Sequence, residues 1–103
     1  MEVICKSQFE EKVVKNEKIV LIDFFANWCG PCKMLMPVLE EVSGERPEID
    51  IFKVNIDQDE DLARKFGVLS IPTMIFFVNG QEKEKLVGYR QKSQILEVID
   101  NLK

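Results

Sequence analysis

The sequence predicts one α/β domain, residues 1–103, with a mixed sheet and helices on both faces of that sheet. Strand-like and helix-like segments alternate along most of the chain, which favours parallel strands joined by right-handed crossovers. Asn79-Gly80 then separates two apolar runs, which is the pattern of an antiparallel hairpin. A chain of 103 residues with 46% hydrophobic residues has the size and composition of a single packed domain.

The first predicted elements are a short strand, a capped helix and a buried strand. An apolar run at residues 3–5 predicts an edge strand. Ser7 begins a capping box, with glutamate three residues later, and predicts a helix over residues 8–15. The run "KIVLIDFFA" at 18–26 is apolar except for Asp23, which is typical of a strand buried on both faces.

The middle of the chain predicts two more helices around another strand. Apolar residues recur at helical spacing over residues 30–45. The run "IDIFKVNID" at 49–57 predicts a strand. The run "DEDLARKFG" at 59–67 starts acidic and ends basic, the order that the helix dipole favours, and Gly67 is a typical helix stop.

The last part of the chain predicts a hairpin followed by a helix. The runs "TMIFFV" at 73–78 and "EKLVGY" at 84–89 flank Asn79-Gly80, and the charged residues between them are expected to form the hairpin tip. Ser93 is expected to cap the final helix. The buried face of that helix is predicted to consist of Ile95, Leu96, Val98, Ile99 and Leu102.

Charge and composition argue against several classes of protein. The net charge is −4 and no basic patch stands out, which argues against nucleic-acid binding. The longest apolar stretches are under ten residues, too short to span a membrane. The first twelve residues lack the charged-then-apolar pattern of a signal peptide. We therefore expect a cytoplasmic protein without membrane association, in a compartment that keeps thiols reduced.

The clearest chemical motif is "WCGPC" at residues 28–32, between the buried strand and the long helix. The chain has no histidine, which excludes a Cys–His couple and a Ser–His–Asp triad. Cys29 and Cys32 are three residues apart, so on helical geometry their Cα atoms lie about 5 Å apart, within disulfide range. Gly30 lets another backbone approach, and Pro31 suits the first helical turn.

The two sulfurs of this pair are expected to differ. Cys29 precedes the helix N-terminus, where unpaired N–H groups and the helix dipole lower the pKa of a thiol. Cys32 lies in the first turn and is expected to be more covered. We therefore expect Cys29 to attack a substrate disulfide and Cys32 to resolve the mixed disulfide.

Other interpretations of the pair are weaker. A zinc site needs four ligands, and the chain offers one cysteine pair, one distant cysteine and no histidine. A structural disulfide that closes so short a loop adds little stability. Inert buried thiols leave the position at a strand-to-helix junction unexplained. Cys5, the third cysteine, is expected to be a small core residue.

Asp23 is the single charge in its buried strand. A buried carboxylate is costly unless it is paired or takes up a proton. One interpretation is a structural pair with Lys53, at a similar place in the next strand. The other is proton exchange with the Cys32 thiol, for which the carboxyl group should have a raised pKa. We favour the functional interpretation.

Several motifs occur in a fixed order along residues 2–102. They are Asp23 in its buried strand, "WCGPCK", Pro37 in the following helix, "KVNID", "SIPT", "NG" and "VGY". With this combination the chain resembles the thioredoxin family, and "WCGPC" is the specific active-site form of that family. The resemblance implies the thioredoxin fold, an α/β fold with a five-stranded mixed sheet in the order 1-3-2-4-5 flanked by four helices. One departure is Phe24-Phe25, where the family often has an aromatic residue followed by tryptophan.

The resemblance also implies the residues of the site. Asp23 and Lys53 match the buried carboxylate of the family and its lysine partner. Ile71-Pro72 would be a cis peptide bond next to the cysteine pair. A flat apolar surface would receive the substrate polypeptide. That surface would consist of Trp28, Gly30, Pro31, Ile71, Pro72, Val87 and Gly88.

The activity that the resemblance implies is reduction of protein disulfides. No cofactor is expected besides the redox-active Cys29–Cys32 disulfide, and the partners would be disulfide-containing proteins and a thioredoxin reductase, with the protein a monomer. The alternatives are a disulfide oxidant or isomerase and a redox-inert binding module of the same fold. Oxidising relatives usually carry histidine between the cysteines, so Gly30-Pro31 favours a reductant. The intact second thiol argues against a pure binding module.

Overall fold

A computed structural model describes all 103 residues and contains a single five-stranded sheet. Its strand order is β1-β3-β2-β4-β5, as predicted. The strands are β1 (Glu2–Val3), β2 (Ile19–Phe25), β3 (Ile49–Asn55), β4 (Thr73–Val78) and β5 (Gln81–Val87). β1 and β2 run parallel to β3, whereas β4 is antiparallel to both β2 and β5, so the predicted mixed sheet is confirmed.

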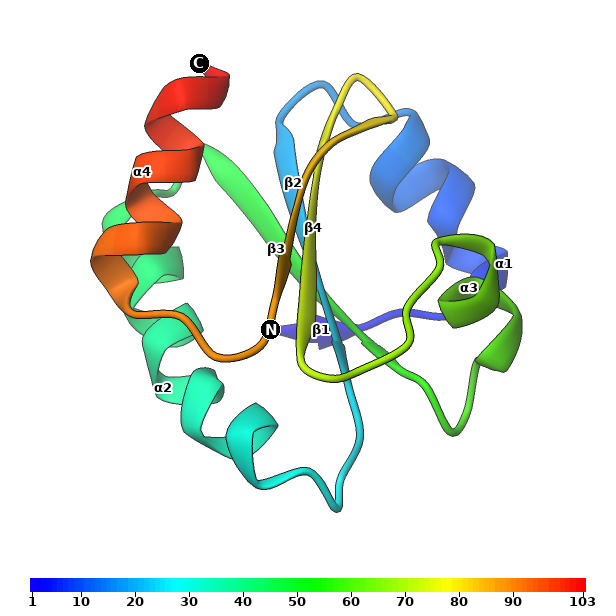
Figure 1. The fold of residues 1–103 in the computed structure, drawn as a ribbon. Helices are drawn as coiled ribbons and strands as arrows, with labels where there is room; N and C mark the ends of the chain where they lie inside the picture. The colour runs from blue at the N-terminus through cyan, green and yellow to red at the C-terminus, as the bar shows by residue number, and fades with distance from the viewer.

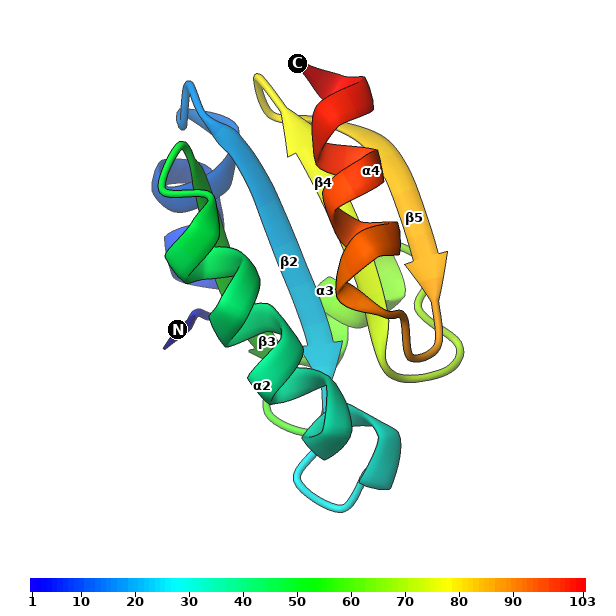
Figure 2. The ribbon, with the colours of Figure 1, turned by 90° about the vertical axis from the view of Figure 1, so that its left-hand side faces the viewer.

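Helices cover both faces of the sheet. They are α1 (Lys6–Phe9), its continuation as the π-helix η1 (Glu10–Val14), α2 (Gly30–Glu45), α3 (Glu60–Lys65) and α4 (Lys92–Leu102). Figure 1 shows α2 and α4 on one face and α1 with α3 on the other, and Figure 2 is turned so that α2 and α4 face the viewer. None of these helices has the length and apolar character that crossing a membrane requires.

Alternation along the strands divides the buried side chains into two layers. Leu21 and Phe76 pack with the buried residues of α2 and α4. Ile22 and Phe24 pack in the layer that contains the buried residues of α1, η1 and α3. Because neighbouring positions on a strand point to opposite faces, the continuous apolar run of β2 fills both layers at once. Asp23, two positions after Leu21, therefore faces the α2 side.

The hairpin between β4 and β5 turns at Asn79-Gly80, with φ angles of 52° and 78°. Positive φ at both positions is the mark of a tight two-residue turn, so β5 begins directly afterwards at Gln81. The polar and charged residues 81–85 therefore form part of the edge strand, and their prediction as a hairpin tip is wrong. Charged side chains are suited to this position because they discourage pairing of an edge strand with other chains.

The start of α1 also differs from the prediction. The backbone N–H of Cys5 donates to Oε1 of Gln8 at 3.0 Å, so the cap lies two residues before Ser7. Cys5 is exposed, which makes its prediction as a core residue wrong. The neighbouring Ile4, 2% exposed, occupies the core position instead. Gln8, and not Glu10, therefore supplies the side chain that reaches back to the start of the helix.

The start of α4 also lies before the serine that was predicted to cap it. The backbone N–H of Gln91 donates to Oε1 of Gln94 at 2.9 Å, so Gln91 and not Ser93 precedes the helix. Ile95 and Ile99 are fully buried, and the other three apolar residues predicted for this face are half-buried. The amphipathic face was therefore predicted correctly even though the cap was not.

Candidate active site

The cysteine pair lies where β2 ends and α2 begins, and this junction is at the lower edge of Figure 2. Cys29 and Cys32 form a disulfide, and their Cα atoms are 5.3 Å apart, close to the separation expected from the sequence spacing. Gly30 is the first residue of α2, and Pro31 lies in its first turn, where no backbone N–H is needed. The start of a helix thus holds the two sulfurs at bonding distance.

Cys29 occupies the N-cap position of α2. Its Sγ accepts a hydrogen bond from the backbone N–H of Cys32 at 3.2 Å. The helix dipole adds to this because its positive end points at Cys29, and both effects favour a thiolate once the pair is reduced. The expected difference in coverage is absent, since Cys29 is 5% and Cys32 3% exposed. Position relative to the helix, and not burial, distinguishes the two sulfurs.

Asp23 is fully buried, and neither of its carboxylate oxygens has a hydrogen-bond partner. Burial raises the pKa of this carboxyl group from 3.8 to about 7, while the positive charge of Lys53 acts in the opposite direction. Lys53 lies opposite Asp23 in the register of β2 and β3, yet its ammonium lies over the ring of Phe25, 4.1 Å from the ring centre. The interpretation of Asp23 as a carboxylate in direct structural pairing with Lys53 is therefore wrong.

Asp23, Lys53 and Cys32 lie on the same side of the sheet. Side chains directly opposite each other on paired strands point to one face, and the row that contains Asp23 faces α2, which begins next to Cys32. A cavity of about 310 Å³ opens here between β1, the end of β2, the first turns of α2, and β3, and its lining includes Phe25, Cys32 and Lys53. We call it the lateral cavity. The fold thus groups one cysteine of the disulfide, a carboxyl group with a pKa of about 7, and a lysine.

A second strand end reaches the cysteine pair from the other side. The Ile71-Pro72 peptide bond is cis, as the resemblance implied. The carbonyl oxygen of Ile71 lies 3.9 Å from Sγ of Cys29. The backbone N–H of Gly88, at the end of β5, donates to the carbonyl oxygen of Pro72 at 2.7 Å. Residues 71–72 and 87–88 are therefore held together beside Cys29.

Exposure of the predicted surface residues is uneven. Trp28 is 68% and Val87 50% exposed, and Gly30 and Pro31 are also exposed. Ile71 and Gly88 are half-buried, whereas Pro72 is buried. The exposed members therefore provide the apolar surface, to which the buried Pro72 adds little area.

Sequence reasoning missed two residues at this edge of the sheet. Asp57 follows β3, and its Oδ2 accepts a hydrogen bond from Nε1 of Trp28 at 2.8 Å. This contact was within reach of the sequence, because β2 and β3 are parallel and their carboxyl ends lie at one edge. Leu69, in the loop before Ile71, is 99% exposed. No pattern in the sequence marks a single exposed leucine in a loop.

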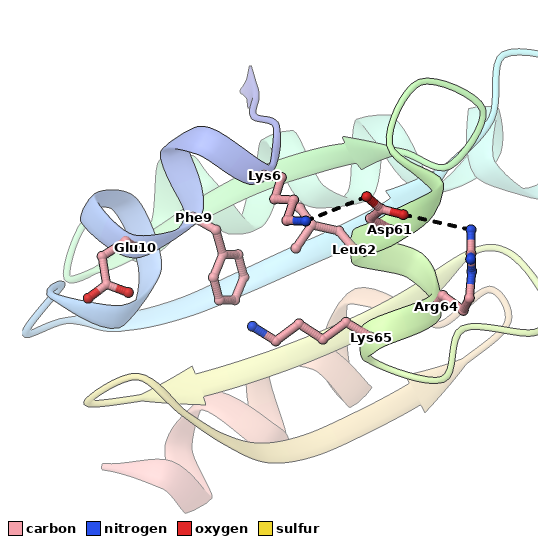
Figure 3. Close-up of a pocket in the computed structure, with 7 residues that line it drawn as sticks. All are labelled: Lys6, Phe9, Glu10, Asp61, Leu62, Arg64 and Lys65. Atoms are coloured by element: carbon pink, nitrogen blue, oxygen red, sulfur yellow. Dashed lines mark hydrogen bonds and ion pairs between the residues drawn. The ribbon is translucent and has the colours of Figure 1, made fainter.

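The largest hollow of the molecule lies elsewhere, between α1 and α3 (Figure 3). It has a volume of about 590 Å³ and is lined by side chains of both charge signs. Nζ of Lys6 lies 3.5 Å from Asp61, and Arg64 lies 3.8 Å from the same carboxylate. These side chains are well exposed, so their ion pairs are screened by solvent. This hollow is on the face of the sheet opposite α2 and contains neither cysteine of the pair.

The structure places no further zinc ligands beside the cysteine pair. No group of three or more cysteine, aspartate or glutamate side chains is arranged to hold a metal ion. Cys5, the third cysteine, lies at the exposed start of α1. The pair therefore lacks the two additional ligands that a tetrahedral zinc site requires.

Comparison with known proteins agrees with this geometry. The sequence model of the thioredoxin family, described as thioredoxin, matches residues 1–101. A thioredoxin of Rickettsia bellii is 41% identical over 95% of this chain and 94% of its own length. A thioredoxin of Chlamydia trachomatis is 43% identical over 96% and 95%, and one of Staphylococcus haemolyticus 44% identical over 94% and 92%. The chain therefore belongs to the thioredoxin family and is a thiol–disulfide oxidoreductase that reduces protein disulfides through a Cys-Gly-Pro-Cys pair.

Proposed function

We propose that Cys29 is the nucleophile of this reaction and Cys32 the resolving thiol. The observation that supports this assignment is the hydrogen bond from the backbone N–H of Cys32 to Sγ of Cys29. An anionic sulfur at this position gains from the N–H group and from the dipole of α2. A sulfur inside the first turn has no equivalent donor ahead of it.

The proposed reaction proceeds in two exchanges. The Cys29 thiolate attacks one sulfur of a substrate disulfide, forms a mixed disulfide and expels the other substrate sulfur as a thiolate. The Cys32 thiolate then attacks Sγ of Cys29, and the second substrate sulfur leaves as a thiolate. Two electrons pass from the cysteine pair to the substrate, and the Cys29–Cys32 disulfide remains.

Asp23 is proposed to take the proton of the Cys32 thiol before the second exchange. A base works best when its pKa is near the working pH, and burial raises the pKa of Asp23 to about 7. Lys53 is proposed to moderate this pKa, because its positive charge favours the ionised carboxylate. The lack of any hydrogen bond to the Asp23 oxygens supports this role, since a fixed ion pair would hold the group ionised.

The apolar surface around the disulfide is proposed to bind an extended segment of the substrate protein. Trp28 and Val87 provide exposed apolar area on it. The proximity of the Ile71 carbonyl to Cys29 supports a role for residues 71–72 in aligning the substrate backbone. The proposed substrate-binding residues are Trp28, Gly30, Pro31, Ile71, Pro72, Val87 and Gly88.

We further propose that residues 1–103 act as a single domain and as a monomer in the cytoplasm. Its oxidised pair would be reduced again by a thioredoxin reductase, and no cofactor beyond the disulfide would take part. Relatives described as thioredoxin over nearly their whole length support this setting.

Covalent trapping tests the order of attack. A Cys32→Ser variant should retain its substrates as mixed disulfides on Cys29, whereas a Cys29→Ser/Cys32→Ser control should retain none. Non-reducing gels of the variant mixed with an oxidised model protein would show the adduct. An adduct formed instead by Cys29→Ser alone would reverse the two roles.

A redox titration of the pair, followed by Trp28 fluorescence, distinguishes reductant from oxidant. A midpoint potential more negative than about −230 mV is that of a reductant under cytosolic conditions. A value of about −120 to −180 mV would assign the chain to the oxidants or isomerases.

A further inference from the structure

The lateral cavity has the size and chemical character of a small-ligand site. Its volume of about 310 Å³ lies at the lower end of the range of roughly 300–1,000 Å³ that is typical of such sites. Phe25, Cys32 and Lys53 form a buried part of its lining, with exposed fractions of 9%, 3% and 5%. Val3 of β1 and Met36 of α2 are the more exposed apolar lining residues and lie at its mouth.

The charges at this cavity are all of one sign. Lys33 and Lys53 are its charged lining residues, and no carboxylate belongs to the lining. Lys53 is 95% buried, yet its ammonium has no oxygen partner and lies over the ring of Phe25. A cation–aromatic contact offsets only part of the cost of burying a charge. The cavity therefore offers a lysine ammonium that contacts no protein carboxylate, next to apolar side chains.

We propose that the lateral cavity binds a small monoanion with an apolar body, namely an aliphatic or aryl monocarboxylate. Its carboxylate pairs with the ammonium of Lys53, and its hydrocarbon part lies along Phe25 and Met36. The site is separate from the proposed protein-binding surface, because neither Trp28 nor Val87 belongs to the lining. The proposal concerns binding to the oxidised protein and does not depend on the order of the thiol exchanges.

Ligand binding at this site is coupled to the protonation state of Asp23. Lys53 of β3 faces Asp23 of β2, and a bound carboxylate competes with Asp23 for the same positive charge. Lys33 of α2 is the other charged lining residue, and the Cys32 sulfur is bonded to Cys29 in the oxidised protein and does not titrate, while β1 contributes only the uncharged Val3. Two anions beside one cation repel each other, so the ligand binds best while Asp23 is protonated. By the same linkage, the ligand keeps Asp23 protonated and slows any step in which Asp23 accepts a proton.

Octanoate is a suitable probe, and octan-1-ol is its neutral match. We would titrate each into the oxidised, isotope-labelled full chain at pH 6 and pH 8 and follow the backbone amide signals by NMR. Octanoate should give saturable shifts at Phe25, Cys32 and Lys53, and should bind at least tenfold more tightly than octan-1-ol at pH 6. Binding should weaken at pH 8. A Lys53→Met variant should lose the preference for the carboxylate over the alcohol.

Two methionines of α2 provide a matched pair of variants that leaves the charges in place. A Met36→Trp substitution fills the mouth of the cavity and should abolish the shifts. Met34 is 62% exposed on the same helix and is not a lining residue, so Met34→Trp should bind octanoate like the unmodified chain. The proposal is overturned if octanoate and octan-1-ol bind equally well. It is also overturned if Met36→Trp binds unchanged, or if the shifts appear around Trp28 and Val87 instead.

Discussion

Two carboxyl groups near α2 each have a basic residue nearby, and their pKa values are shifted in opposite directions. Asp100 of α4 contacts Arg46 at the end of α2, with Oδ1 2.7 Å from Nη1 and Oδ2 3.2 Å from Nη2. These hydrogen bonds lower the pKa of Asp100. Asp23, fully buried near the other end of α2, forms no hydrogen bond or ion pair with Lys53, and burial raises its pKa to about 7.

The difference shows what separates a structural ion pair from a proton-exchanging group. At the surface, direct contact with a guanidinium keeps Asp100 ionised and joins two helices. In the interior, the carboxyl group of Asp23 is removed from water but receives no compensating hydrogen bond, so its neutral form is favoured until the pH is near neutral. The residue type is the same, and only the environment decides the role.

The largest expected effect is on stability when Asp23 is replaced by leucine. An acid with a raised pKa in the folded chain keeps its proton there after the unfolded chain has lost it, so stability falls as the pH rises from 3.8 to about 7 and is then constant. At about 1.4 kcal/mol per pKa unit, this rise corresponds to a loss of about 4 kcal/mol. Asp23→Leu should therefore be the more stable protein at pH 8, by a few kcal/mol, and this difference should be smaller at pH 4.

Urea unfolding of both oxidised proteins at pH 4, 6 and 8 provides the check. The difference between the two free energies of unfolding isolates Asp23 from all other titrating groups. A variant that is less stable than the unmodified chain at pH 8 would show that the carboxylate is stabilised by contacts the structure lacks.

The second-largest expected effect is on the rate at which Cys32 attacks the mixed disulfide. Asp23→Asn keeps the size of the side chain but removes its basic function, so release of substrate from the mixed disulfide should slow by about a hundredfold at pH 8. In the unmodified protein this rate should rise with pH through about 7 and then level off, because the base must be ionised. Stopped-flow fluorescence between pH 6 and 9 would measure it, with Asp100→Asn as the surface control. An inflection near pH 7 that persists in Asp23→Asn belongs to another group.

A smaller effect is expected from Lys53→Met. This change removes the positive charge that lowers the pKa of Asp23, so the inflection of the same rate profile should move to higher pH by about one unit, or about tenfold in proton concentration. Lys33→Met is the matched control, because Lys33 lies close by but is exposed. Equal shifts in both variants would mean that general surface charge, and not the buried ammonium, influences Asp23.

The smallest effect is expected at the surface pair. Asp100→Asn should lower Tm by at most a few degrees, and addition of about 1 M salt should remove most of that difference. Because the pKa of Asp100 is lowered in the folded chain, its contribution is present above the ordinary pKa of an aspartate and is lost as the pH falls through the lowered value. Its pH dependence therefore has the opposite sign to that of Asp23. A large, salt-resistant loss of Tm would contradict this comparison.

Much of the fold was predictable from local patterns. The apolar run of β2, the helical spacing of α2 and the Asn79-Gly80 turn each depend on residues close in sequence, and each was found with errors of a few residues. The helix caps were less predictable, because Gln8 and Gln94 accept from backbone N–H groups that lie two residues before the predicted serine caps.

The sequence by itself determined the disulfide pair at the start of a helix and the single carboxylate in a buried strand, because helix geometry and hydrophobic periodicity act over a few residues. Only the tertiary structure decided that the Lys53 ammonium lies over Phe25 and leaves Asp23 without a partner. It also decided that the Ile71 carbonyl reaches Cys29 from a loop far along the chain. These contacts depend on how rows of side chains from different strands and helices fit together, and no short stretch of sequence contains that information.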